Sequence, residues 1–172
     1  MYDVVFRAAE RADCGLILSF IRELAVYERM GDDVTATEAL LEEWLFDKHT
    51  AEVMFAVVDG NEVGFALYFA NFSTFLGRAG LYLEDIYIKP DYRRYGIGTA
   101  MFKRLAQLAV ERGYGRFEWV CLDWNTPSID FYKLHGAKPM DEWTIHRLSG
   151  DALLKLGQPS KEGEYLWTNK HG

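Results

Sequence analysis

The sequence has little cysteine, no long apolar run and no excess of positive charge. Its two cysteines, Cys14 and Cys121, lie far apart and lack the spacing of metal ligands. This excludes a disulfide framework and favours two core thiols in a reducing cytoplasm. No stretch approaches the roughly 20 apolar residues of a membrane-spanning helix, and the first residues do not resemble a secretory signal. We therefore expect a cytoplasmic protein that does not associate with membranes.

The charge balance is acidic, with 19 lysine and arginine residues against 26 aspartate and glutamate residues, a net charge of −7. Such a chain has no global electrostatic reason to bind nucleic acid, and it attracts cations instead. The same charge also aids solubility. The total charge therefore does not decide between a cationic ligand and none.

Length and composition indicate one folded domain. Hydrophobic residues make up 49% of the 172 residues, which excludes a largely disordered chain. The sequence contains no internal repeat and no Pro/Ser-rich linker. We expect a single domain over residues 1–172, in which residues 149–172 form a C-terminal appendage with an aromatic pair, Tyr165 and Trp167.

The apolar periodicity predicts an α/β fold in which strands and helices alternate. Apolar residues at spacings of three and four indicate helices, and short apolar runs bounded by turn residues indicate strands. Asp13 is the expected N-cap of the first helix, and Asp59-Gly60-Asn61 is a hairpin signal. The expected strands are 4–7, 53–58, 63–72, 80–88, 117–122 and 143–148, and the expected helices are 14–29, one after Thr37, 96–112 and 125–136.

The most informative stretch is the strand–turn–helix that contains Arg93-Arg94-Tyr95-Gly96-Ile97-Gly98. Glycines at a helix start leave backbone N–H groups uncovered, and these groups with the helix dipole bind anions. The two arginines can pair with phosphate. The stretch is not a P-loop, because no Lys-Ser/Thr follows, and it lacks the first glycine of the dinucleotide motif. A tight turn without a ligand is the alternative interpretation of the glycines alone.

The Arg-x-x-Gly-x-Gly pattern after a strand resembles the acyl-CoA pyrophosphate loop of the GNAT acyltransferases. Four further segments resemble the spermidine/spermine acetyltransferases and their thialysine-acetylating relatives. The resemblance extends from about residue 6 to 148 and implies a GNAT-type fold, a mixed central sheet with splayed strands four and five and flanking helices. The four segments are 23–28 (ELAVYE), 82–88 (YLEDIYI), 123–125 (DWN) and 131–133 (FYK).

The resemblance implies acetyl-CoA as the co-substrate, held between the two splayed strands. Backbone groups of the fourth strand would bond the pantetheine, and the helix start would bind the pyrophosphate. Asn125 at the head of the next helix would contact the pantetheine or act as an N-cap. The implied cofactor-binding residues are Ile86, Tyr87, Ile88, Arg93, Arg94, Tyr95, Gly96, Ile97, Gly98, Thr99, Asn125, Thr126, Pro127 and Ser128.

Two residues are the candidates for proton transfer. The resemblance places Tyr132 beside the thioester sulfur, where a phenol can protonate the departing thiolate. It also places Glu84 near the acceptor amine, where it would accept a proton through water. Asp85 would be a second acidic contact or a structural partner, because successive strand residues face opposite sides unless a bulge intervenes.

The remaining acidic and aromatic candidates would line a channel for the amine. Glu118 interrupts an apolar strand and would hold the distal cation of an elongated diamine. Near Trp143 the match slips by one residue, so either Asp141 or Glu142 takes an acidic role. The implied substrate-binding residues are Tyr27, Glu28, Glu84, Asp85, Glu118, Trp119 and Val120.

The four histidines are scattered without ligand spacing, so we expect no metal cofactor. The sequence therefore predicts an enzyme that acetylates a primary amine of a small cationic substrate by direct attack, either a polyamine or a thialysine-like amine. The alternatives are another small amine, a protein lysine, or a non-catalytic CoA-binding regulatory module. The relatives are homodimers, which makes a homodimer the expected state.

Overall fold

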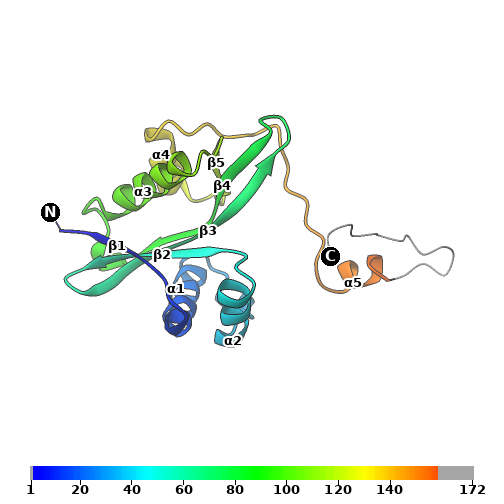
Figure 1. Ribbon diagram of the computed structural model, residues 1–172, viewed down its shortest axis with the longest axis horizontal. Helices are drawn as coiled ribbons and strands as arrows, with labels where there is room; N and C mark the ends of the chain where they lie inside the picture. The colour runs from blue at the N-terminus through cyan, green and yellow to red at the C-terminus, as the bar shows by residue number, and fades with distance from the viewer. Residues whose placement is uncertain (1, 159–172) are drawn as a thin grey trace. The chain divides into compact units, whose positions relative to one another are not determined.

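A computed structural model describes residues 2–158 of the chain (Figure 1). The chain divides after Leu122 into two compact units. The first unit contains the sheet, in the order β1-β2-β3-β4-β5, and the second contains two helices. Of the predicted appendage over 149–172, the part from residue 159 onward, with Tyr165 and Trp167, lies outside the described residues. A single domain over the whole chain stays a prediction.

The sheet is mixed, as the resemblance implies. Strands β1 to β4 pair antiparallel with their neighbours, and β5 runs parallel to β4. Asp59 and Gly60 both have positive φ, which matches the two-residue turn expected between β2 and β3. The strands are β1 Val5–Ala8, β2 Glu52–Val58, β3 Asn61–Ser73, β4 Arg78–Ile88 and β5 Phe117–Trp119.

Helices cover both faces of this sheet. In Figure 1, α1 (Cys14–Tyr27) and α2 (Glu38–Leu41) lie on one face and α3 (Ile97–Glu111) lies on the other. Thr37 caps α2 as a side-chain acceptor for Leu40 N–H at 3.2 Å, and a π-helical turn, Glu42–Asp47, continues it. Single 3-10 turns complete the first unit at Arg11–Asp13, Gly31–Asp33 and Pro90–Tyr92.

The core on the α1 side is aromatic. Phe20 of α1 is fully buried, and its ring stacks on Phe65 with a centroid distance of 5.2 Å and lies 5.9 Å from Phe55. Phe65 faces Phe55 on one side and Tyr87 on the other, so the three side chains share one face. Each large apolar side chain contributes about 1.5–3 kcal/mol by burial, and this core fixes α1 against β4.

Two sequence-based expectations differ from the structure at the chain's beginning and at β5. Asp13 does not cap α1 with its side chain; it accepts from Glu10 N–H at 2.7 Å and pairs with Arg7. The strand expected over 117–122 ends at Trp119, where its pairing with β4 ends. The continued apolar run does not extend the strand, because a strand needs a paired neighbour for its backbone groups.

The second unit contains α4 (Thr126–Leu134) and α5 (Gly150–Leu156), and its predicted strand is absent. Residues 143–148 form no strand in the described part of the chain, and Trp143 and Ile145 are 71% and 65% exposed. The alternation of apolar residues that predicted a strand is present. No described segment supplies the backbone partners that would convert the pattern into a strand.

Candidate active site

The predicted anion loop has the local geometry that its glycines imply. Gly96 is the N-cap of α3 and has φ of +84°, a conformation that side chains disfavour. The first helical bond of α3 runs from Ala100 N–H to the Gly96 carbonyl at 2.9 Å. The N–H groups of Ile97, Gly98 and Thr99 therefore have no partner within the helix. Three N–H donors at the positive end of α3 form a cradle suited to phosphate.

The two arginines of this loop differ from each other. Arg94 is exposed, and its φ of +67° is unusual for a residue other than glycine. Arg93 is half-buried, and its Nε donates to the carbonyl oxygen of Ile88 at 2.8 Å. Its guanidinium lies over the rings of Tyr27 and Tyr87. The sequence predicted both side chains at the anion, whereas the structure turns Arg93 toward β4.

Tyr95, the residue between Arg94 and Gly96, is 53% exposed. Its ring lies 4.9 Å from that of Tyr2, in an edge-on arrangement. The N-terminal segment thus packs against the outer side of the loop.

Strand β4 has an open edge beyond its short pairing with β5. That pairing joins Leu81–Leu83 to Phe117–Trp119, and β4 continues to Ile88. Lys89 N–H bonds Val63 on β3, and Gly64 faces Ile88, so the backbone of Tyr87 is paired with Phe65. In an antiparallel pair, alternate residues direct their backbone N–H and C=O groups to the opposite edge of the strand. Ile86 therefore offers its N–H and C=O, and Ile88 its N–H, at the open edge, where an extended ligand can pair like a strand; the Ile88 carbonyl already accepts from Arg93.

A β-bulge separates the two candidate carboxylates. Leu83 faces Tyr68 and Asp85 faces Leu67, so Glu84 is the extra residue on β4. The bulge removes the strict alternation that would send Glu84 and Asp85 to opposite faces. Asp85 lies in register with Leu67 and Val53 on the α1 face, whereas Glu84 is exposed.

Asp85 has the most strongly perturbed carboxyl group of the first unit. Burial raises its pKa to about 7, and the negative charges of Glu84 and Glu28 act in the same direction. Glu28 follows α1 as its C-cap residue, and burial raises its pKa as well. Tyr27, the last residue of α1, is half-buried beside it. The structure therefore brings Glu28, Glu84 and Asp85 together, and a proton acceptor with a pKa near neutrality suits proton transfer.

Glu118 is placed on β5 but its charge is compensated. Its Oε2 lies 2.8 Å from Nε of Arg116 and accepts from Nδ2 of Asn71 at 2.9 Å. The sequence did not single out Arg116 or Asn71. The sequence feature that could have pointed to these two residues is Gly80, which pairs with Asn71. A Cβ at Gly80 would lie 2.6 Å from an atom of the Asn71 side chain and 2.6 Å from an atom of the Arg116 side chain.

The other two substrate candidates near β5, Trp119 and Val120, lie in different surroundings. Trp119 packs its ring against Phe102 of α3 at 5.0 Å and against Phe117 at 4.9 Å. Val120, beyond the end of the strand, is 52% exposed. Of the three predicted substrate residues on or just after β5, Glu118, Trp119 and Val120, only Val120 is exposed.

The second unit carries the helix-head residues and the candidate phenol. Asn125 is the N-cap residue of α4 and is 6% exposed, and Thr126, Pro127 and Ser128 form the first turn. Its carbonyl, not its side chain, accepts from Ser128 and Ile129 N–H. Tyr132 is half-buried on α4, with its ring 5.5 Å from that of Phe131. Asp141 and Glu142 are both exposed.

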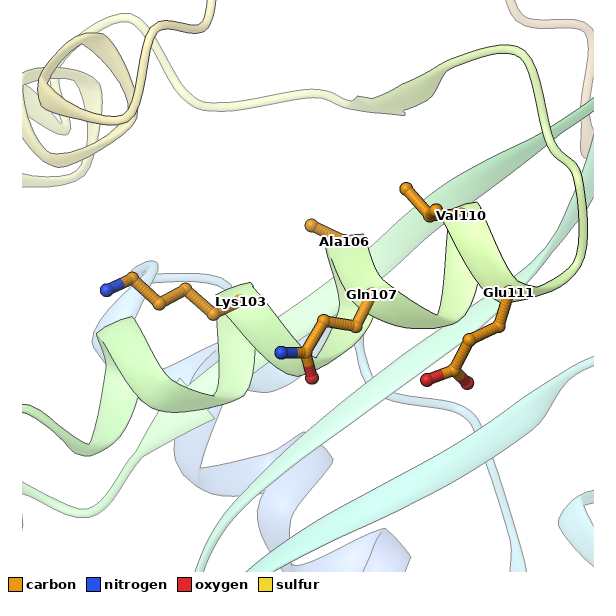
Figure 2. Close-up of a pocket in the computed structure, with 5 residues that line it drawn as sticks. All are labelled: Lys103, Ala106, Gln107, Val110 and Glu111. Atoms are coloured by element: carbon orange, nitrogen blue, oxygen red, sulfur yellow. The ribbon is translucent and has the colours of Figure 1, made fainter.

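A separate hollow of about 600 Å³ lies along the outer face of α3. Figure 2 shows its lining side chains, which come from the two middle turns and the end of the helix: Lys103, Ala106, Gln107, Val110 and Glu111. None of these residues belongs to the sequence-predicted site. Among residues 2–158, no three His, Cys, Asp or Glu side chains gather in a way that would hold a metal ion.

Comparison with known proteins identifies this arrangement. Residues 17–137 match the Acetyltransferase (GNAT) family. The chain belongs to this family. The GNAT chain is 39% identical over 168 residues to thialysine N-epsilon-acetyltransferase of Sus scrofa, covering 91% of this chain and 98% of that one. It is 46% identical over 93 residues to L-ornithine N5-acetyltransferase NATA1 of Arabidopsis thaliana, covering 54% of this chain and 41% of that one.

A solved structure supports the same assignment. The integron cassette protein VCH_CASS6 from the mobile metagenome of V. cholerae superposes with a TM-score of 0.74 and 28% identity, covering 89% of this chain and 96% of that chain. The open edge of β4 and the free N–H groups of α3 fit the acetyl-CoA that a GNAT acetyltransferase uses. No helix within residues 2–158 is long and apolar enough to cross a membrane.

Proposed function

We propose that this GNAT acetyltransferase transfers an acetyl group from acetyl-CoA to a primary amine of a small cationic substrate. The substrate class is a thialysine-like or ornithine-like side-chain amine, or a polyamine. The observation that carries the proposal is the group of three carboxylates, Glu28, Glu84 and Asp85, on and beside β4 at its bulge. An acidic group at this place complements an ammonium substrate.

The cofactor side is formed by backbone groups. Acetyl-CoA supplies the activated acetyl thioester. The N–H groups of Ile97, Gly98 and Thr99 bind its pyrophosphate, with Arg94 beside them, and the edge groups of Ile86 and Ile88 hold its pantetheine. Because backbone groups do this work, the side chains of Ile86 and Ile88 are not required for it.

The acceptor side must remove a proton, because an ammonium cannot attack a thioester. Glu84 and Asp85 act as a coupled pair of proton acceptors, with exposed Glu84 contacting the amine through water. Glu28 and Tyr27 line the approach from α1. Tyr132 donates the proton that the departing thiolate needs, a role that rests on the family resemblance of its segment.

A substrate panel tests the proposal. Thialysine, lysine, ornithine, spermidine, spermine and short diamines are assayed with acetyl-CoA, and release of free thiol is followed. We expect the largest kcat/KM with a side-chain amine of an amino acid, as in the names of the two relatives. Thiol release with none of these amines, despite CoA binding, would favour the regulatory module over the enzyme.

We also propose a cytoplasmic homodimer. Apolar residues of the second unit support the dimer, since Trp143, Ile145 and Leu148 are 71%, 65% and 46% exposed. Large exposed apolar residues that cluster in sequence are typical of interaction surfaces. Light scattering on the purified chain measures its mass directly, and a mass near 19.8 kDa at micromolar concentration would contradict the dimer.

A further inference from the structure

Arg93 links three elements of the first unit at one point. Its Nε donates to the Ile88 carbonyl at 2.8 Å. Its guanidinium carbon lies 4.8 Å from the ring centroid of Tyr27 and 5.1 Å from that of Tyr87. Such distances are within the range of cation–π attraction. The loop after β4 is thus fastened to the end of β4 and to the last residue of α1.

The contact with α1 is reinforced one turn earlier. Glu23 and Tyr27 are four residues apart and share a face of α1. Tyr87 is 6% exposed, its hydroxyl interacts with both Glu23 and Arg93, and burial raises its pKa. Arg93 and Tyr87 therefore hold the final turn of α1 in place. Glu28, a member of the carboxylate group, is the next residue of the chain.

Because these contacts engage the side chain of Arg93, Arg94 is the arginine of the loop that is available to the cofactor. The Nε of Arg93 donates to the Ile88 carbonyl at the end of the open edge, and its guanidinium lies over the rings of Tyr27 and Tyr87. Arg94 is exposed, and within residues 2–158 no hydrogen bond or ion pair holds its side chain elsewhere. Adjacent arginines in one motif thus have different surroundings.

We infer that Arg93 is a positioning residue for the amine side of the site, acting through Tyr27 and Glu28, and that Arg94 is the arginine that meets the phosphates. The inference rests on the proposed function. Loss of the guanidinium leaves the Ile88 carbonyl without its donor and the Tyr27 ring without its cation. The final turn of α1, with Glu28, then loses one of its contacts with the loop after β4, while the N–H cradle of α3 is unchanged.

The experiment measures the two ligands separately, without turnover. Calorimetry gives the Kd of CoA, and then the Kd of the best amine from the panel with protein saturated by CoA. For Arg93→Met we expect amine affinity about tenfold weaker, from one lost hydrogen bond and two lost cation–π contacts. CoA affinity changes less than twofold. Arg94→Met should show the opposite pattern.

Three further variants keep the result interpretable. Arg93→Lys retains the cation and one donor, so it should restore much of the amine affinity even where Arg93→Met folds poorly. Arg22→Met removes an exposed arginine from α1 and should alter neither Kd. In a double-mutant cycle, Arg93→Met should cost less amine affinity in the Tyr27→Leu background than in the wild type, because the Arg93–Tyr27 contact is already lost there.

Two of the three possible results separate the inference from the proposed function. CoA binding weakened tenfold by Arg93→Met, with amine binding unchanged, would identify Arg93 as a phosphate ligand and overturn the inference while the acetyltransferase proposal stands. A wild-type protein that binds CoA and the amine but releases no thiol would contradict the proposed function while the two dissociation constants still test Arg93. A wild-type protein that binds no amine would contradict both.

Discussion

Glu84 is the bulged residue of β4, and Asp85, its neighbour, faces the α1 side of the sheet in register with β3. The bulge gives two adjacent carboxylates different surroundings. Glu84 is exposed, whereas Asp85 is half-buried and its pKa is raised to about 7. The pair thus combines one group that meets water with one that changes its charge near neutral pH.

Asp85→Asn should remove a pH dependence from the reaction. The carboxylate accepts a proton only when it is ionised, so kcat/KM of the wild type should rise with pH and level off above about 7. The variant should lose this acidic limb and lower kcat/KM by about 10²-fold, the scale of a lost general base. The pH profile of thiol release checks this. An unchanged limb in the variant would assign the titration to another group.

The same substitution should stabilise the fold at alkaline pH. The folded protein holds the Asp85 proton up to about pH 7, while the unfolded chain releases it near 3.8. Between these values the folded state binds more protons, so stability falls as pH rises, and the penalty is complete above about 7. It amounts to a few kcal/mol, at about 1.4 kcal/mol per pH unit. Urea unfolding should show Asp85→Asn above wild type at pH 8 and near it at pH 4.

Glu28→Gln should shift the acidic limb of the pH profile to lower pH. The negative charge of Glu28 helps to raise the pKa of Asp85, so its removal lets Asp85 ionise more readily. The amine KM should also rise, because one acidic contact is lost. Asp59→Asn is the matched control, since it neutralises an exposed carboxylate in the β2–β3 turn. A limb that moves equally in both variants would point to net charge alone.

Gly96→Ala should weaken acetyl-CoA binding and lower stability. A Cβ at Gly96 meets nothing within 4 Å, so the cost comes from φ of +84° and is about 1–2 kcal/mol. Relief of that strain tilts the first N–H groups of α3, and KM for acetyl-CoA should rise several-fold. Gly60→Ala has similar strain, with φ of +76° in the β2–β3 turn, and it should lower Tm without changing KM. Equal KM values in the two variants would remove the loop from cofactor binding.

Tyr132→Phe should lower kcat by about 10²-fold or more, the scale of a lost general acid, with little change in either KM. Tyr114→Phe, which removes a hydroxyl from the turn after α3, serves as the control for loss of a phenol. Thermal unfolding of both variants shows whether the fold is kept. A kcat of Tyr132→Phe within twofold of wild type would exclude Tyr132 from the mechanism.

Much of the fold was predictable because the deciding signals are local. The turn at Asp59-Gly60 and the N-cap at Gly96 depend on a few consecutive residues. The apolar spacing of α1 and α3 likewise fixes which side of each helix is buried. The predicted strand over 143–148 was wrong, because strand formation needs a partner that no local pattern specifies. The sequence predicted only that Glu84 and Asp85 face opposite sides unless a bulge intervenes, and it did not predict the bulge that the structure contains at Glu84.

The sequence by itself determined the order of helices and strands as far as α4, the glycine cradle and the family to which the chain belongs, since each depends on residue types at short spacings. The tertiary structure alone decided three properties of the site. Asp85 is buried near Glu28, Arg93 lies between Tyr27 and Tyr87, and Glu118 is paired with Arg116 and Asn71. Burial and charge are sums over neighbours from distant parts of the chain, and only the folded sheet brings those neighbours together.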